Sequence, residues 1–388
     1  MGSYVRILGL VVLLPTVFGS PVPLEETAET TAEFQKELDR LREIHRFPGA
    51  TAAFALSNGE CQAFATGHAD RELSVPMTTD SLQPIGGVGK TFTAAVILSL
   101  VQDGVLTLDD KVAKWLGKDR WIWRLPNHTG VTIRMLLNHS TGIPNHAEDD
   151  RFVRTLRQGL RANPDFRFTP EELVQFVLDK DALFAPGRGF RYSDTNYILA
   201  GLVIERATGS SYYGELVRRI LTPLRLDLTG PADRRGLPSL ATGYVEGPNL
   251  LGLPRKVVSR GMLVINPLNE WTGGGLVSSS GDLARWAMIL YQGKALSEPY
   301  LDSMLDAVAT SIKGQRYGLG VQIENSELGT LYGHDGSFPG YRSCMAYFPE
   351  HRVALALQIN TNAEIDTRKC LISLARVVIG KATRSSGR

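Results

Sequence analysis

The chain has 388 residues, of which 43% are hydrophobic and 21% charged, and its formal net charge at pH 7 is +2. This composition is typical of a globular protein, and the near balance of charges gives no electrostatic basis for binding nucleic acid. The length exceeds one compact core and indicates two lobes. Cys61, Cys344 and Cys370 are too few for a disulfide framework and lack metal-ligand spacing. No metal and no cofactor is expected.

The first twenty residues are predicted to be a signal peptide. Residues 7–18, "ILGLVVLLPTVF", form an apolar run of the right length, and the small residues Gly19 and Ser20 follow it. The run is too short to span a bilayer, and Pro15 interrupts it. We therefore expect a secreted or periplasmic protein with no stable membrane insertion after signal removal.

The segment that follows is predicted to be a helix over 31–49. Phe34, Leu38, Leu41 and Ile44 recur at helical spacing, and the segment ends at a Pro-Gly pair. One face of this helix is therefore expected to be buried.

Residues 49–67 read as two strands joined at Asn58-Gly59, a strong hairpin signal. Residues 91–104 are nearly all apolar, which predicts a buried helix.

Helical patterns dominate residues 130–225, and Thr169 with Pro170 marks the start of one of these helices. Short strand-like runs return over 315–360, and a closing helix is predicted at 364–379.

Strands near both ends of the chain, with helices between them, predict an α/β (α+β) fold of two domains. An antiparallel sheet flanked by helices would come from residues 31–125 and 270–388, and 126–269 would form an inserted, mostly helical domain.

The stretch "PIGGVGKT" could be taken for a phosphate-binding loop. Such a loop needs glycine at the position of Pro84 and follows a buried strand, whereas "LSVPMTTDSLQP" precedes this one. Nucleotide chemistry is therefore the weaker interpretation.

Three motifs resemble those of the penicillin-recognising serine hydrolases, the group of class C β-lactamases, D-Ala-D-Ala carboxypeptidases and related esterases. "GGVGKTFTA" matches the S-x-x-K motif, with Gly87 at the serine position and Lys90 in place. "GFRYSDTNY" matches Tyr-x-Asn, with Tyr192 and with Asp194 for the asparagine. "YGHDGSFPGY" supplies His334 for the third motif. The resemblance covers roughly residues 35–375 and implies a β-lactamase-like fold.

The resemblance also implies roles for these residues. Position 87 and Lys90 are three residues apart, so they share a helix face, and a buried lysine can lose its proton near neutrality and activate a serine. Tyr192 would relay the proton to the leaving group. The amides of residue 87 and Ser337, just after Gly336, would stabilise an oxyanion.

Several residues also have a purely structural interpretation. Tyr192 could be a packing aromatic, because the chain has twelve tyrosines, and His334 could lie at a strand edge. His128, His139 and His146 lie close together, but their spacings fit no common zinc site, and His139 is interpreted as structural.

Two departures bear on function. Gly87 cannot form an acyl-enzyme, and an ionised Asp194 cannot donate a hydrogen bond to a substrate carbonyl, which favours ester, acyl-transfer or other peptide substrates over β-lactams. The expected partner is a small-molecule or peptide acyl substrate. Adding the hydroxymethyl group by Gly87→Ser is expected to cost little in folding.

Three interpretations stay open. The chain is an engineered, inactive serine-to-glycine variant of such a hydrolase; a natural relative in which Lys90 and Tyr192 run non-covalent acid–base chemistry (isomerisation, elimination or cyclisation); or a non-catalytic ligand-binding protein.

Overall fold

The structure is a computed structural model that describes residues 28–385; the predicted signal peptide lies outside the described residues. The helices are α1 (Ala28–His45), α2 (Gly89–Gln102), α3 (Val112–Leu116), α4 (Ile133–Leu137), α5 (Asp150–Ala162), α6 (Pro170–Gln175), α7 (Asp194–Thr208), α8 (Tyr212–Leu216), α9 (Thr222–Leu224), α10 (Trp271–Gly274), α11 (Ser280–Tyr291), α12 (Tyr300–Leu305) and α13 (Thr367–Ser385). The strands are β1 (Gly49–Leu56), β2 (Cys61–Asp70), β3 (Val75–Pro76), β4 (Gln83–Pro84), β5 (Thr229–Pro231), β6 (Val258–Ser259), β7 (Met262–Leu263), β8 (Leu276–Ser278), β9 (Val308–Ala309), β10 (Arg316–Tyr317), β11 (Gln322–Ser326), β12 (Gly329–Phe338), β13 (Tyr341–Phe348) and β14 (Val353–Ile359).

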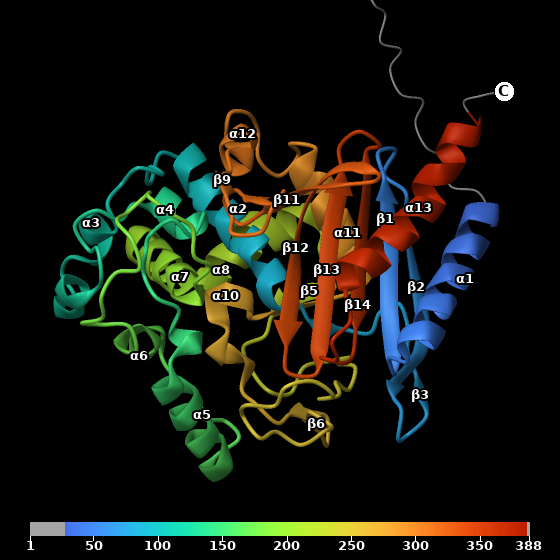
Figure 1. Ribbon diagram of the computed structural model, residues 1–388, viewed down its shortest axis with the longest axis horizontal. Helices are drawn as coiled ribbons and strands as arrows, with labels where there is room; N and C mark the ends of the chain where they lie inside the picture. Colours follow the sequence, from blue (N-terminus) through green and yellow to red (C-terminus); the bar gives the residue numbers. More distant parts are fainter. Residues whose placement is uncertain (1–27, 386–388) are drawn as a thin grey trace, which may run out of the picture.

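A nine-stranded sheet forms one side of the molecule (Figure 1). Its order is β3-β2-β1-β14-β13-β12-β11-β10-β9, and all its neighbouring strands are antiparallel. The first strands along the chain therefore pair with the last, as in the register of Ala52 with Leu357. The expected antiparallel sheet flanked by helices is confirmed. The boundaries proposed between a sheet domain and an inserted domain stay a prediction.

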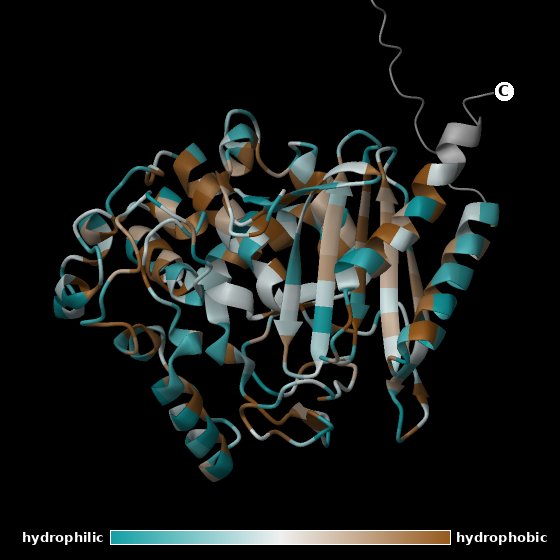
Figure 2. Cartoon of the chain, viewed as in Figure 1, coloured by the Kyte–Doolittle hydropathy of each residue, from teal (hydrophilic) through white to brown (hydrophobic). Residues whose placement is uncertain are grey.

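The two faces of this sheet carry residues of different size. In β14, Leu355 and Leu357 belong to the core under α1 and α13, whereas Ala354 and Ala356 face the core on the α11 side. Successive side chains of a strand point to opposite faces, so a simple alternation of large and small residues builds both layers. Figure 2 shows hydrophobic residues along these strands, and hydrophilic residues alternating with hydrophobic ones along α1 and α13.

The first predicted helix is confirmed as α1, with Phe34, Leu38 and Leu41 buried. Ile44 was expected on the same face and is 58% exposed, which corrects that assignment. At about 100° of rotation per residue, Ile44 lies roughly 80° around the helix from Phe34, outside the stripe that contacts the sheet.

The helix α2 runs through the interior, as its sequence predicts. Most of its residues are buried, and Phe92 stacks on Trp286 of α11 with ring centres 4.4 Å apart. The predicted start of α6 is confirmed by a capping box, in which Thr169 and Glu172 bond to each other's backbone amides.

A small sheet and a short 3₁₀ turn bring the start of α2 against β12. Strands β4, β8 and β5 pair in that order, and β4 leads directly into the turn Gly86–Val88. Gly86 has φ +47°, and a Cβ there would lie 2.5 Å from the carbonyl oxygen of Ser337, so glycine is required at this approach.

Among residues 28–385, no helix is long and apolar enough to cross a membrane.

Candidate active site

All seven residues proposed from the sequence motifs line one cleft of about 490 Å³. It lies between β12 on one side and the starts of α2, α7 and α10 on the other. These lining residues are Gly87, Lys90, Tyr192, Asp194, His334, Gly336 and Ser337. The structure thus brings together residues up to 250 positions apart; their chemical roles stay predictions.

Position 87 is crowded by the neighbouring strand. A Cβ on Gly87 would lie 2.7 Å from the carbonyl oxygen of Asp335 and 3.0 Å from Cε1 of His334. The first contact is closer than real Cβ atoms come, and its partner is backbone, which cannot swing away. The expectation that Gly87→Ser folds at little cost is therefore wrong for this structure.

Lys90 is buried in the first turn of α2 and is held by two acceptors. Its side chain is 1% exposed, and Nζ donates 2.7 Å hydrogen bonds to Oδ1 of Asp194 and to the carbonyl oxygen of Gly273. Asp194 begins α7 and is 28% exposed, so this ion pair forms the inner wall of the cleft.

The pair fixes the charge of both groups. Burial lowers the pKa of Lys90, but the Asp194 carboxylate and Tyr192 more than offset it, so the pKa is raised above its ordinary value. Burial raises the pKa of Asp194, and the ammonium of Lys90 outweighs it, giving a pKa lowered to about 2. The expectation that Lys90 loses its proton near neutrality is therefore wrong, because the residue that replaces asparagine is a carboxylate.

Tyr192 packs beside this ion pair. Nζ of Lys90 lies 4.9 Å from the centre of the Tyr192 ring, and the ring of His139 lies 4.4 Å away between centres. Burial raises the pKa of Tyr192 well above its ordinary value, against the opposing effect of Lys90. The phenol is therefore protonated at neutral pH.

Both ring nitrogens of His334 are already engaged. Nδ1 lies 2.6 Å from the carbonyl oxygen of Asp335, which can only accept, so Nδ1 carries the proton. Nε2 therefore accepts from the hydroxyl of Tyr317, 2.8 Å away. Burial, then the charge of Lys90, lowers the pKa of His334 to about 4, so it is neutral and held in one orientation.

His139 and His146 are buried near the cleft and are also hydrogen-bonded. Nδ1 of His139 accepts from the amide of Ser193, and Nδ1 of His146 lies 3.0 Å from Oγ1 of Thr195. In the part of the chain that the structure describes, no group of three or more His, Cys, Asp or Glu is placed to hold a metal ion.

Sequence motifs missed Glu270, which also lines the cleft. It directly precedes α10, and the "WTGGG" that follows it is the signal that could have found it. Burial, then the Asp194 carboxylate, raises the pKa of Glu270 to about 7, against the opposing effect of Lys90. This carboxyl group therefore titrates near neutrality.

Two arginines were also missed, and they line the same cleft. Arg368, at the start of α13, donates to Oε1 of Gln322 at 2.8 Å and lies 3.0 Å from a carboxylate oxygen of Asp335. Arg342 lies on β13. The cleft is therefore lined by the carboxylates of Asp194 and Glu270 and also by arginines, of which Arg368 is paired with Asp335.

Comparison with known proteins shows the family and the fold of this chain. The family described as beta-lactamase matches residues 34–376. Penicillin-binding protein 4* of Bacillus subtilis (strain 168) is 29% identical over 357 residues, which cover 89% of this chain and 75% of that protein.

Solved structures show the same fold. A D-stereospecific amidohydrolase from Streptomyces sp. is 30% identical with a TM-score of 0.76, over 87% of this chain and 96% of that chain. D-amino acid amidase from Ochrobactrum anthropi SV3, solved with L-phenylalanine amide, is 26% identical with a TM-score of 0.75. The match covers 93% of this chain and 100% of that chain. With the family match over nearly all described residues, the chain belongs to the beta-lactamase family of penicillin-recognising hydrolases.

Proposed function

We propose that the cleft binds a small amide or peptide ligand and does not form an acyl-enzyme with it. The observation that carries this proposal is at position 87, where glycine has no nucleophile and a Cβ would lie 2.7 Å from the Asp335 carbonyl oxygen. The similar proteins named for amide hydrolysis support the ligand class.

The paired departures support natural divergence over a single engineered substitution. Loss of the serine alone would leave Lys90 ready to act as a base, but Asp194 also holds Lys90 as an ammonium ion. Both halves of the nucleophile–base pair have therefore been disabled.

Mass spectrometry of the intact protein tests this proposal. After incubation with p-nitrophenyl acetate or benzylpenicillin, we expect no mass increase, while calorimetry detects binding of small amides. A stoichiometric adduct at the cleft would overturn the proposal, as would the absence of any amide binding.

Two variants show whether glycine at position 87 and aspartate at position 194 both prevent acylation. We expect Gly87→Ser to remain poorly acylated, because Lys90 keeps its proton. The double variant Gly87→Ser with Asp194→Asn removes the carboxylate and should gain an ester-derived adduct. Both substitutions are expected to cost stability, so circular dichroism first establishes the temperature at which each variant is folded, and acylation is compared there. Full acylation of the single variant would show that the ion pair does not suppress the base.

A second candidate is non-covalent acid–base catalysis, an isomerisation, elimination or cyclisation. The pKa of about 7 at Glu270 favours this group over Lys90 and Tyr192 as the proton acceptor. Turnover of an amide ligand without an adduct, lost in Glu270→Gln and retained in Tyr192→Phe, would support this acid–base function.

We also propose that the chain is exported, on the basis of the apolar run at residues 7–18. Expression of the full chain in a host that exports proteins carrying signal peptides, followed by N-terminal sequencing, tests this proposal. Export predicts a mature N-terminus close to residue 21 in the medium or periplasm, and an intact N-terminus in the cytoplasm contradicts it.

A further inference from the structure

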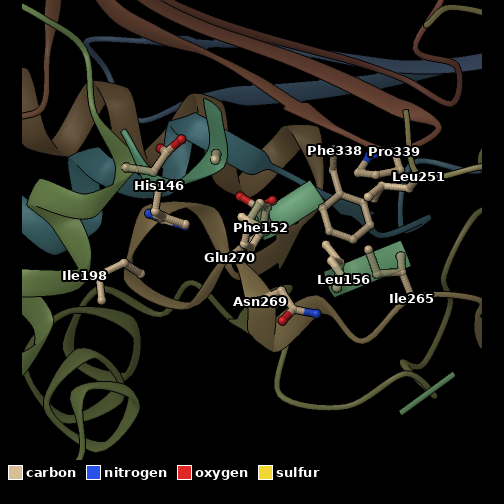
Figure 3. Close-up of a pocket in the computed structure, with 12 residues that line it drawn as sticks. His146, Phe152, Leu156, Ile198, Leu251, Ile265, Asn269, Glu270, Phe338 and Pro339 are labelled. Carbon is tan, nitrogen blue, oxygen red and sulfur yellow. The ribbon is translucent and has the colours of Figure 1, made fainter. Parts of the chain in front are cut away.

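A second, smaller cavity opens beside the cleft. It has a volume of about 100 Å³ and is enclosed mainly by apolar side chains. Figure 3 shows Glu270 in the midst of these side chains, with Phe338, Leu156 and Ile265 to one side and His146 and Ile198 to the other. Asp194 and Glu270 line both the cavity and the cleft, so the two spaces meet at these carboxylates.

The two carboxylates differ in what they have left to bind. Asp194 already accepts from Lys90. Within residues 28–385, the carboxylate of Glu270 makes no hydrogen bond and no ion pair, although it is half-buried. A partly desolvated carboxylate without a partner is unfavourable, and a cationic ligand group would satisfy it.

We propose that this side cavity and Glu270 form a recognition site for an α-ammonium group next to an apolar side chain, as in an amino acid amide or the N-terminal residue of a peptide. The side chain fills the cavity, the ammonium donates to Glu270, and the adjoining carbonyl lies in the main cleft. This inference rests on the proposed amide binding and specifies which amides are bound.

The size of the cavity selects among side chains. An engineered apolar cavity of about 150 Å³ in another protein holds benzene. A cavity of about 100 Å³ is therefore suited to a branched aliphatic group such as that of leucine, and too small for an indole.

Calorimetry with three matched probes tests the inference on the wild-type chain. Leucinamide, tested as the D and L forms separately, carries the α-ammonium group, the apolar side chain and the amide carbonyl. 4-Methylpentanamide lacks only the amino group, and glycinamide lacks only the side chain. We expect one form of leucinamide to bind about ten-fold or more tighter than either of the other probes.

Two variants test separately the contact of the ammonium group with Glu270 and the fit of the side chain in the cavity. Glu270→Gln keeps the shape and removes the charge, so the advantage of leucinamide over 4-methylpentanamide should disappear while 4-methylpentanamide binds as before. Leu251→Trp places bulk at the half-buried rim of the cavity and should weaken leucinamide while sparing glycinamide. Glu43→Gln removes one negative charge from an exposed position of α1 and should change the affinity for neither leucinamide nor glycinamide.

The outcomes separate this inference from the proposed function. Equal affinity for leucinamide and 4-methylpentanamide, or no effect of Glu270→Gln, would overturn the recognition site and leave amide binding in place. If none of the three amides binds to the wild-type chain, the proposed function fails as well.

Discussion

At the level of single residues, the ion pair between Lys90 and Asp194 sets the charge of the cleft. The ammonium of Lys90 is removed from water while Asp194 stays partly exposed, and the carbonyl oxygen of Gly273 also accepts from the ammonium. Such a pair adds little net stability over apolar residues, but removing one partner leaves a buried charge uncompensated. The pair is therefore sensitive to loss of Asp194.

Asp194→Asn should lower the free energy of unfolding by about 3 kcal/mol at pH 7. The matched control is Asp179→Asn, whose partner Arg124 is on the surface and whose own side chain is 59% exposed; its loss should cost clearly less, because solvent screens the pair. Urea unfolding followed by circular dichroism measures both. Equal losses would show that Lys90 does not need its partner.

The pH dependence of this difference follows from the pKa of Asp194, lowered to about 2. A carboxylate with a lowered pKa stabilises the fold above its unfolded value, about 3.9, and that contribution is lost as pH falls through the folded value. The gap between wild type and Asp194→Asn should therefore be widest near pH 5 and close between about pH 4 and 2; above neutrality it should narrow as the buried, unpaired Lys90 of the variant loses its proton. A gap that persists at pH 2 would contradict the assignment.

The pKa of Glu270 leads to a separate prediction about the pH dependence of leucinamide binding. Its pKa of about 7 in the free protein means that the carboxylate is present only above neutrality, while an α-ammonium group is lost above about pH 8. The groups facing Glu270 are Asp194, Lys90 and His146, of which His146, with a pKa of about 4, stays neutral across this window. Leucinamide affinity should therefore peak between about pH 7 and 8, and calorimetry of Glu270→Gln should show no acid-side decline.

At the level of elements, the close approach of the 3₁₀ turn Gly86–Val88 to β12 shapes the active-site cleft. Oγ of Ser343 donates to the carbonyl oxygen of Ile85 at 2.7 Å and fastens the turn to the sheet. Two consecutive glycines lie at this contact, Gly86 facing Ser337 and Gly87 facing Asp335.

Gly87→Ala should therefore destabilise the chain, by about 1–3 kcal/mol, because the added methyl overpacks the contact with β12. Gly230→Ala, in β5, meets nothing within 4 Å and should stay within about 0.5 kcal/mol of wild type. Thermal and urea unfolding provide the comparison. A neutral Gly87→Ala would mean that β12 moves aside readily and that the nucleophile position is open.

At the level of the whole molecule, α1 and α13 pack on one face of the large sheet and α11 on the other (Figure 1). The core beneath α1 and α13 joins both ends of the described chain, and α13 begins beside Arg368 of the cleft. Folding of the C-terminal helix and the placement of Arg368 in the cleft are therefore linked.

Leu374 of α13 is completely buried in that core, and Leu374→Ala should cost about 2–5 kcal/mol of unfolding free energy. Ile372 lies on the same helix and is half-buried, so Ile372→Ala should cost clearly less. If the two variants lose equal stability in urea, α13 is not docked on the sheet as described.

Much of this arrangement could be predicted from the sequence, because it depends on local patterns. The Asn58-Gly59 turn, the apolar run of α2 and the capping residues at Thr169 each specify an element from neighbouring residues alone. The three motifs also identified residues that prove to line one cleft, because motif spacing reflects a shared fold.

The chemistry of the cleft depended on contacts that no local pattern contains. Lys90 and Asp194 are 104 positions apart, and whether the lysine is a base or a fixed ammonium is decided by their 2.7 Å contact. Position 87 is crowded by a strand nearly 250 residues away, and Glu270 acquires its pKa from burial beside Asp194. The sequence by itself determined the elements and the family; tertiary packing decided the charge states and the free space, because both depend on groups brought together only by folding.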